Sequence, residues 1–102
     1  KPDFKLMKEL SGLAVAVSAK AKDYDCISRV FAPELAIAED PVTGSTHCMI
    51  APYWAKKYGK NHIKAFQASE RTGELFCEVC DGCNKVKISG KAVLFGISDI
   101  LI

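Results

Sequence analysis

The stretch EDPVTGSTHCMIAPYWAKKYG, residues 39–59, decides the fold of this 102-residue chain. Two acids and a proline lead into a glycine flanked by hydroxyl residues, and an apolar run follows. From Ser45 to Tyr58 the apolar residues lie almost all the way round the helical axis, which is typical of a buried central helix. Pro52 interrupts the helix interior and predicts a kink or an irregular turn. Gly59 suits the position after the last helical turn.

The N-terminus of this predicted helix is a candidate anion site. First-turn N–H groups lack partners inside a helix, and the helix dipole adds roughly half a positive charge there. Gly44 allows a ligand to approach the backbone closely, and Ser45 and Thr46 add hydroxyl groups. A carboxylate or a phosphate is the simplest ligand for such a site. Asp40, just upstream, can orient a substrate amine or hydroxyl group or take part in proton transfer.

The same residues also fit a purely structural role. Ser and Thr before an apolar run are ordinary helix caps, and the residue types alone favour this interpretation. Glu39 alone is typical of a solvated loop acid. Both interpretations of the helix start remain open on this basis.

Further elements are predicted on both sides of the central helix. Upstream we expect a short helix over residues 4–10, a strand buried on both faces over 13–19, a strand over 24–31 and a loop over 32–44. Downstream we expect strands over residues 62–69, 74–79, 85–89 and 91–97, each with one buried face, and a hairpin turn at Asp81-Gly82. This order favours an α+β fold in which a curved mixed sheet or barrel wraps around one central buried helix.

Length and composition fit a single globular domain over residues 1–102. Hydrophobic residues make up 49% and charged residues 25%, and the basic residues behind the net charge of +2 are scattered. We therefore expect no nucleic-acid or membrane-surface partner. No apolar run reaches the ~18 residues that span a bilayer and no signal peptide is visible, so we expect a cytoplasmic protein. We also expect the chain to continue at both ends, since the apolar residues 97–102 need a neighbour to cover them.

The five cysteines are expected to be reduced thiols, because their number is odd and no secretory context is visible. CEVCDGC, residues 77–83, invites a zinc or a redox interpretation. Zinc needs four ligands and no clear fourth one is near, while Cys77 and Cys80 on a strand face opposite sides. Cys80 and Cys83 flank a turn, where oxidation would permit a disulfide. Reduced hairpin thiols without a metal remain the expectation.

Cys48 and His47 do not form a nucleophilic pair, because adjacent helical residues point about 100° apart. His47 is expected to be packed and hydrogen-bonded. Cys48 is expected to be a small core residue.

A family resemblance adds to these inferences. FAPELAIAEDPVTGSTHCMIAPYWAKKYGK, residues 31–60, closely resembles the second half of proteins in the PhzF-like phenazine-biosynthesis family. The shared pattern is an acid, then Asp-Pro-Val-Thr-Gly-Ser, a small residue, a His, and an apolar helix that contains Pro-Tyr-Trp. QASERTGEL, residues 67–75, is similar to the family's Gln-x-Ser-x-Arg-Gly-Gly segment, with Thr72 in place of the first Gly. VKISGKAVL, residues 86–94, matches its closing strands, so the resemblance covers nearly the whole chain.

The resemblance implies a diaminopimelate-epimerase-like fold with two similar halves and an active site in the cleft between them. Each half wraps a sheet around a central helix whose N-terminus points at the cleft. The type member is a cofactor-independent isomerase of a dihydro-hydroxyanthranilate, in which a glutamate moves a proton between ring carbons. That glutamate and the family's active-site histidine lie in the first half. This chain would then be the C-terminal half of a homodimeric two-domain protein.

The resemblance also implies site residues. Asp40 and Ser45 match the family's active-site aspartate and serine and are the catalytic candidates. Gly44 and Ser45 would offer backbone N–H groups to a substrate carboxylate, with Thr46, where the family often has Ala, completing the binding set. Arg71 either binds an anion or forms a salt bridge.

The expected function is that of a cofactor-independent isomerase or epimerase, without a metal, that moves a proton on a small carboxylated substrate. The alternative is a non-catalytic module on the same scaffold that binds small anions or a partner protein.

Overall fold

The computed structural model describes all residues 1–102. Two helices, α1 (Phe4–Met7) and α2 (Gly44–Tyr58), and the 3-10 turn η1 (Pro33–Leu35) accompany five strands. The strands are β1 (Val15–Ala19), β2 (Cys26–Phe31), β3 (His62–Gln67), β4 (Gly73–Val79) and β5 (Val86–Ser89).

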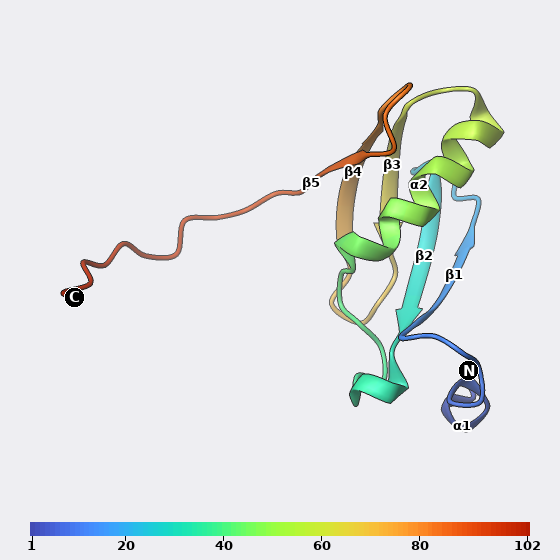
Figure 1. Ribbon diagram of the computed structural model, residues 1–102, viewed down its shortest axis with the longest axis horizontal. Coiled ribbons are helices and arrows are strands. Elements are labelled where there is room, and N and C mark those ends of the chain that lie inside the picture. Colours follow the sequence, from blue (N-terminus) through green and yellow to red (C-terminus); the bar gives the residue numbers. More distant parts are fainter.

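The five strands form one mixed sheet in the order β1-β2-β3-β4-β5. β2 and β3 are parallel and α2 connects them, whereas the other three pairs are antiparallel. Figure 1 shows α2 crossing one face of this sheet. The prediction of an α+β fold with a mixed sheet is confirmed. The predicted barrel is wrong, because the edge strands β1 and β5 do not pair and the sheet stays open.

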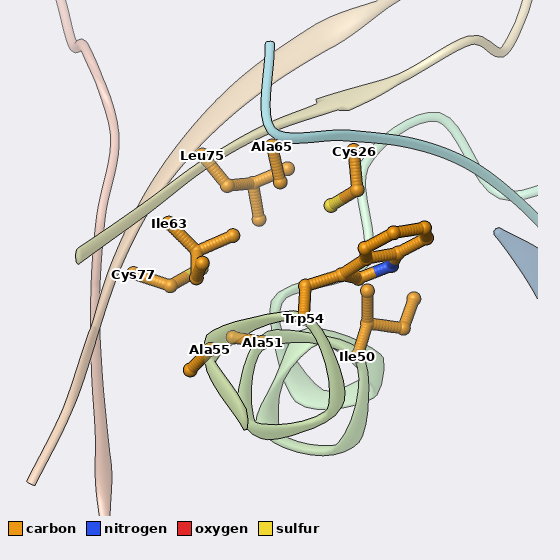
Figure 2. Packing of buried hydrophobic residues seen from close by; sticks show 9 residues of the cluster. All are labelled: Cys26, Ile50, Ala51, Trp54, Ala55, Ile63, Ala65, Leu75 and Cys77. Atoms are coloured by element: carbon orange, nitrogen blue, oxygen red, sulfur yellow. The ribbon is translucent and has the colours of Figure 1, made fainter. Parts of the chain in front are cut away.

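Helix α2 packs on the sheet with one side only. Its inner residues meet side chains of β2, β3 and β4 (Figure 2), and the cluster comprises Cys26, Ile50, Ala51, Trp54, Ala55, Ile63, Ala65, Leu75 and Cys77. On the outer side Met49 is 71% and Tyr53 59% exposed. The predicted span of the helix is confirmed to within one residue. The prediction that it is buried all round is wrong, since an open sheet covers only one face.

Two upstream elements also differ from expectation. β1 was predicted to be buried on both faces, but four of its five residues are exposed, because it lies at the sheet edge with β2 as its only neighbouring strand. The first helix ends at Met7 and not at Leu10. Asp3 caps this helix, since its carboxylate accepts a hydrogen bond of 3.1 Å from the Leu6 N–H group.

Residues 91–102 form no helix and no strand. They leave the sheet after β5 and extend away from the rest of the chain (Figure 1). Their large apolar side chains are at least 77% exposed, namely those of Val93, Leu94, Phe95, Ile97, Ile100, Leu101 and Ile102. The predicted strand over residues 91–97 is therefore wrong for this chain, because no strand within it pairs with the segment. We call residues 91–102 the tail.

The cysteines fall into two groups. Cys80 and Cys83 are joined by a disulfide across the β4–β5 turn, with Cα atoms 5.5 Å apart. The prediction of reduced thiols is wrong for this pair, since the hairpin brings both residues to bonding distance. Cys26, Cys48 and Cys77 are free. Cys48 is exposed, so its predicted place in the core is also wrong.

The arrangement of possible metal ligands and the character of the helices both bear on function. No group of three His, Cys, Asp or Glu side chains lies close enough together to hold a metal ion. Neither helix has the length and the apolar character that crossing a bilayer would require.

Candidate functional site

The turn from Asp40 to Thr43 leads directly into α2. The Asp40 N–H group donates to the Val30 carbonyl oxygen at 2.8 Å, which joins the turn to β2. The Thr43 hydroxyl donates to the Asp40 carboxylate. Thr43 occupies the N-cap position, yet its side chain makes no capping bond to the helix. The first-turn N–H groups of α2 therefore lack the side-chain cap that this residue type usually provides.

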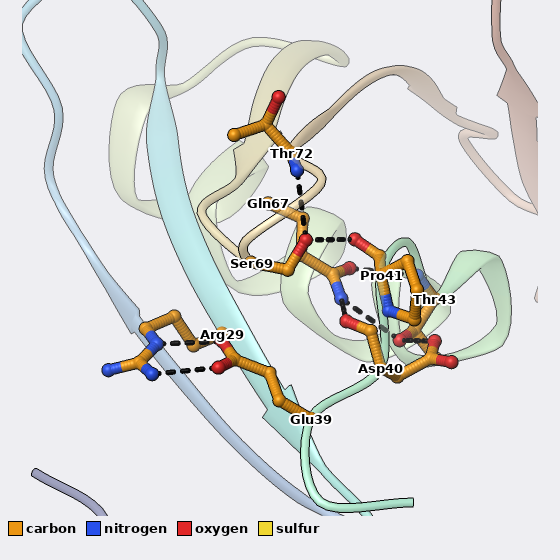
Figure 3. A network of polar contacts seen from close by, with 8 residues as sticks. All are labelled: Arg29, Glu39, Asp40, Pro41, Thr43, Gln67, Ser69 and Thr72. Atoms are coloured by element: carbon orange, nitrogen blue, oxygen red, sulfur yellow. Dashed lines mark hydrogen bonds and ion pairs between the residues drawn. The ribbon is translucent and has the colours of Figure 1, made fainter.

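Gln67, at the end of β3, holds this turn in place (Figure 3). Its side chain is completely buried. The Gln67 Nε2 group donates to the Asp40 carbonyl oxygen at 2.7 Å and to Thr43 Oγ1 at 3.1 Å. Its Oε1 atom accepts from the Thr43 N–H group at 2.8 Å. One buried amide thus fixes the backbone on both sides of Pro41-Val42, and with it the direction of the Asp40 carboxylate.

The segment after β3 supports the same turn. The Ser69 hydroxyl donates to the Pro41 carbonyl oxygen at 2.7 Å, and the Thr72 N–H group donates to Ser69 Oγ at 3.0 Å. Thr72 has a φ of 59°, a left-handed conformation that favours glycine. A Cβ atom on Gly73 would lie 2.1 Å from Val42 Cγ2, so any larger residue here would force the Val42 side chain to move. Thr72, which stands where the family usually has glycine, thus adopts a conformation typical of glycine and still bonds to Ser69.

His47 lies in the first turns of α2 and is completely buried. Its Nδ1 atom is 2.7 Å from the Thr43 carbonyl oxygen, which can only accept, so Nδ1 carries the proton. In the neutral ring Nε2 then accepts from the Ser28 hydroxyl at 3.2 Å. Burial lowers the pKa of His47, and the bond to Thr43 opposes this shift. The prediction of a packed, hydrogen-bonded histidine is confirmed.

The two neighbouring acids have different partners. Glu39 Oε1 and Oε2 accept from Arg29 Nε at 2.7 Å and Nη2 at 2.8 Å, a bidentate pair between the loop and β2. The hydrogen bond from Arg29 holds the pKa of Glu39 below its usual value. Glu39 is thus a paired residue and not the solvated loop acid expected from its type. Asp40 bonds through its carboxylate to Thr43 and has no cationic partner.

Asp40 lines a surface pocket of about 590 Å³ together with Arg71, Thr72, Gly73, Glu74 and Lys91, among others. Lys91 pairs with Glu74 at 3.0 Å, while Arg71 forms no ion pair within the chain. The alternative in which Arg71 forms a salt bridge therefore finds no carboxylate partner within this chain. The sequence patterns did not link Lys91 or Glu74 to Asp40, because only the sheet brings β4 and the tail to this turn.

Gly44, Ser45 and Thr46 form the first turn of α2 beside Asp40. Ser45 is exposed and Gly44 is partly exposed. Thr46 is only 7% exposed, so its hydroxyl offers little surface to a ligand and a contact there would rest on its backbone. Sequence reasoning did not single out Gln67 as a site residue. The signal was its place at the start of the Gln-x-Ser-x-Arg segment, beside a predicted buried strand.

Comparison with known proteins identifies relatives of this arrangement. Residues 1–96 match the family model PhzC-PhzF, described as phenazine biosynthesis-like protein. A Pseudomonas aeruginosa protein named as an uncharacterized isomerase is 46% identical over 94 residues, which cover 92% of this chain and 36% of that protein. The mouse phenazine biosynthesis-like domain-containing protein 2 is 51% identical over 72 residues, which cover 70% of this chain and 24% of that protein.

Solved structures agree with these matches. A crystal structure of a putative phenazine biosynthesis PhzC/PhzF protein from Clostridium difficile has a TM-score of 0.86 and 46% identity, covering 100% of this chain and 39% of that one. A PhzF-family structure from Enterococcus faecalis has a TM-score of 0.86 and 44% identity, over 94% of this chain and 36% of that one. The chain thus spans between 24% and 39% of the length of these relatives. On the family model and on both structural matches, this chain belongs to the PhzC-PhzF family of phenazine biosynthesis-like proteins.

Proposed function

We propose that this chain is the C-terminal half of a cofactor-independent isomerase with a diaminopimelate-epimerase-like fold. It would move a proton on a small carboxylated substrate bound between two similar halves. The observation that carries the proposal is the joint fixation of the Asp40 carboxylate and the uncapped N-terminus of α2 by Gln67. The names of relatives as isomerases support the reaction class.

In this proposal the start of α2 binds the substrate carboxylate. The N–H groups of Gly44 and Ser45 are the donors, aided by the dipole of the helix and by the backbone at Thr46. Fixed donors of this kind also stabilise negative charge as carbon loses its proton. Ser45 adds an exposed hydroxyl group. Asp40 orients the substrate or exchanges a proton with it.

The proposed partner is the N-terminal half of the same protein, which would supply the proton-transferring carboxylate. The exposed apolar side chains of the tail support this partner, because a surface of that kind is stable in water only when it is covered. Two-domain chains would then associate as a homodimer, as the family resemblance implies, and the proposed location of the protein is the cytoplasm.

Deuterium uptake tests the proposal. The full-length protein is incubated in heavy water with a dihydro-hydroxyanthranilate as the probe, and the label in recovered probe is measured by mass spectrometry. Asp40→Asn keeps an acceptor for Thr43 but removes the charge, and should lower the rate by roughly 10²–10⁴-fold. Glu39→Gln is the matched control, since it changes the adjacent acid that bonds to Arg29, and its rate should stay near normal.

Two results would count against the proposal. Near-normal exchange in Asp40→Asn would remove Asp40 from the reaction. No exchange in the unmodified protein, with binding of the probe retained, would favour the non-catalytic anion-binding module instead.

A further inference from the structure

Cys48 of α2 and the Cys80–Cys83 disulfide of the β4–β5 turn are the three cysteines outside the core. The Cys80–Cys83 disulfide spans the turn between the two strands. Cys48 of α2 lines a pocket of about 570 Å³ together with Cys83, Pro52, Val79 and Lys85, among others. Cys48 carries a free thiol and is exposed. One pocket is thus lined by a residue with a free thiol and by a residue of the disulfide.

The disulfide is not needed to hold the turn. The Cys80 N–H group donates to the Lys85 carbonyl oxygen at 3.1 Å. The Lys85 N–H group donates to the Cys83 carbonyl oxygen at 2.7 Å. Gly82 takes the left-handed conformation with a φ of 74°. The bonded cysteines are only three residues apart, and so short a closed loop removes little entropy from the unfolded chain. Both cysteines are exposed and therefore accessible to thiols.

The other two thiols differ from Cys48. Cys77 is buried in the core, and burial raises its pKa to about 11. Burial likewise raises the pKa of Cys26 to about 11. Both remain protonated thiols shielded from solvent, whereas an attacking group must be an accessible thiolate. Cys48 meets the requirement of access, and Lys85 adds a positive charge to the same pocket.

We propose that Cys48, Cys80 and Cys83 form a thiol–disulfide exchange site, in which Cys48 replaces Cys80 as the partner of Cys83. Cys48 releases its proton to water, and its thiolate attacks Cys83 Sγ. A Cys48–Cys83 bond forms, the Cys80–Cys83 bond breaks, and Cys80 Sγ takes the electron pair and then a proton. The step needs no external oxidant or reductant. Its product links α2 covalently to the β4–β5 turn.

The exchange is independent of the proposed isomerase activity. In proteins of reducing compartments, disulfides are usually transient and either catalytic or redox-sensing. The co-reactants that would open or reset this site are small thiols and their disulfides, such as glutathione, because the pocket is exposed at Cys48 and Cys83.

Peptide mapping tests the proposal on the purified protein. Tryptic cleavage places Cys48 in residues 30–56 and places Cys77, Cys80 and Cys83 together in residues 72–85, so fragmentation of the cross-linked peptide in the mass spectrometer identifies which cysteine is joined to Cys48. The protein is incubated at mildly alkaline pH with a trace of reduced glutathione and quenched with iodoacetamide. The cross-link between these two peptides should appear at Cys83, with Cys80 alkylated.

Two variants sharpen the outcome. Cys80→Ser with oxidised glutathione should give the Cys48–Cys83 cross-link. The double variant with Cys80→Ser and Cys48→Ser should form no such cross-link, and its Cys83 should carry glutathione. The proposal is overturned if Cys80→Ser carries glutathione on Cys83 while Cys48 is alkylated, or if the unmodified protein never forms the cross-link.

Discussion

The turn at residues 39–44 and the tail at residues 91–102 show opposite relations between sequence and structure. The turn is short, polar and rich in residues that avoid regular structure, yet side chains of β2, β3 and the segment after β3 hold it through hydrogen bonds. The tail is apolar and its first half has a strand-like sequence, yet it forms no element and stays exposed. Specific hydrogen-bonding partners define the turn, while the tail has an apolar pattern without a partner.

Burial of a segment requires a complementary surface, and an apolar sequence alone is not sufficient. Gln67 finds two backbone groups and a hydroxyl within 3.1 Å, so a buried amide is fully used. The strand-like start of the tail pairs with neither open edge of the sheet, so its backbone N–H and carbonyl groups have no partner strand in this chain. A strand forms only when those groups are paired.

Removing the amide of Gln67 should give the largest effect on the turn. Gln67→Leu leaves the Thr43 N–H group and the Asp40 carbonyl without partners, and we expect a loss of roughly 2–4 kcal/mol in the free energy of unfolding. Urea denaturation measures it. Lys64→Gln, on the exposed face of the same strand, is the control and should change stability by less than about 0.5 kcal/mol. Equal losses in both variants would mean that Gln67 does not hold the turn.

His47 should make the turn sensitive to pH. Burial holds the folded pKa of His47 below 6.5, the usual value for histidine, so the unfolded chain binds more protons as pH falls. The stabilisation is complete above about pH 6.5 and is lost as pH falls through the lower, folded pKa. Thermal unfolding between pH 7.5 and 5 should show this decline, and His47→Gln should remove it. His62→Gln, at an exposed site, should leave the slope unchanged; a slope lost there instead would contradict the assignment to His47.

Relief of the left-handed backbone at Thr72 should give a smaller gain. Thr72→Gly removes the Cβ atom that disfavours a φ of 59°, and part of that gain is offset because glycine loosens the unfolded chain. We expect a net stabilisation of about 0.5–1 kcal/mol by urea denaturation. Thr72→Ala keeps the Cβ atom and should not show the gain. A destabilised glycine variant would indicate that the Thr72 side chain supports the turn.

Deleting the tail should have the smallest effect on this chain. Removal of residues 91–102 breaks only the exposed Lys91–Glu74 pair, so the unfolding free energy should change by less than about 0.5 kcal/mol. In the full-length protein the same deletion should be strongly destabilising, if the tail packs against the other half. Equal, small effects in both settings would mean that the tail has no partner there.

Much of the fold was predictable because its signals are local. Apolar residues between Gly44 and Tyr58 predicted α2, and alternation at Leu75, Cys77 and Val79 predicted β4. Glycine requirements at turns and the cap at Asp3 also follow from neighbouring residues alone. The Asp40 to Thr46 candidate site was found the same way, since the whole motif is contiguous.

What the sequence by itself determined is therefore the central helix and the first five strands, the mixed α+β class and the position of the candidate site at the start of α2. Only the tertiary structure decided which faces are covered, that the sheet stays open, and that Gln67, from a strand 24 residues beyond Thr43, holds the turn. The physical reason is the distance along the chain over which each interaction acts. Helix periodicity and turn preferences act between neighbours in the chain, whereas burial and hydrogen-bond partners depend on segments that meet only after folding.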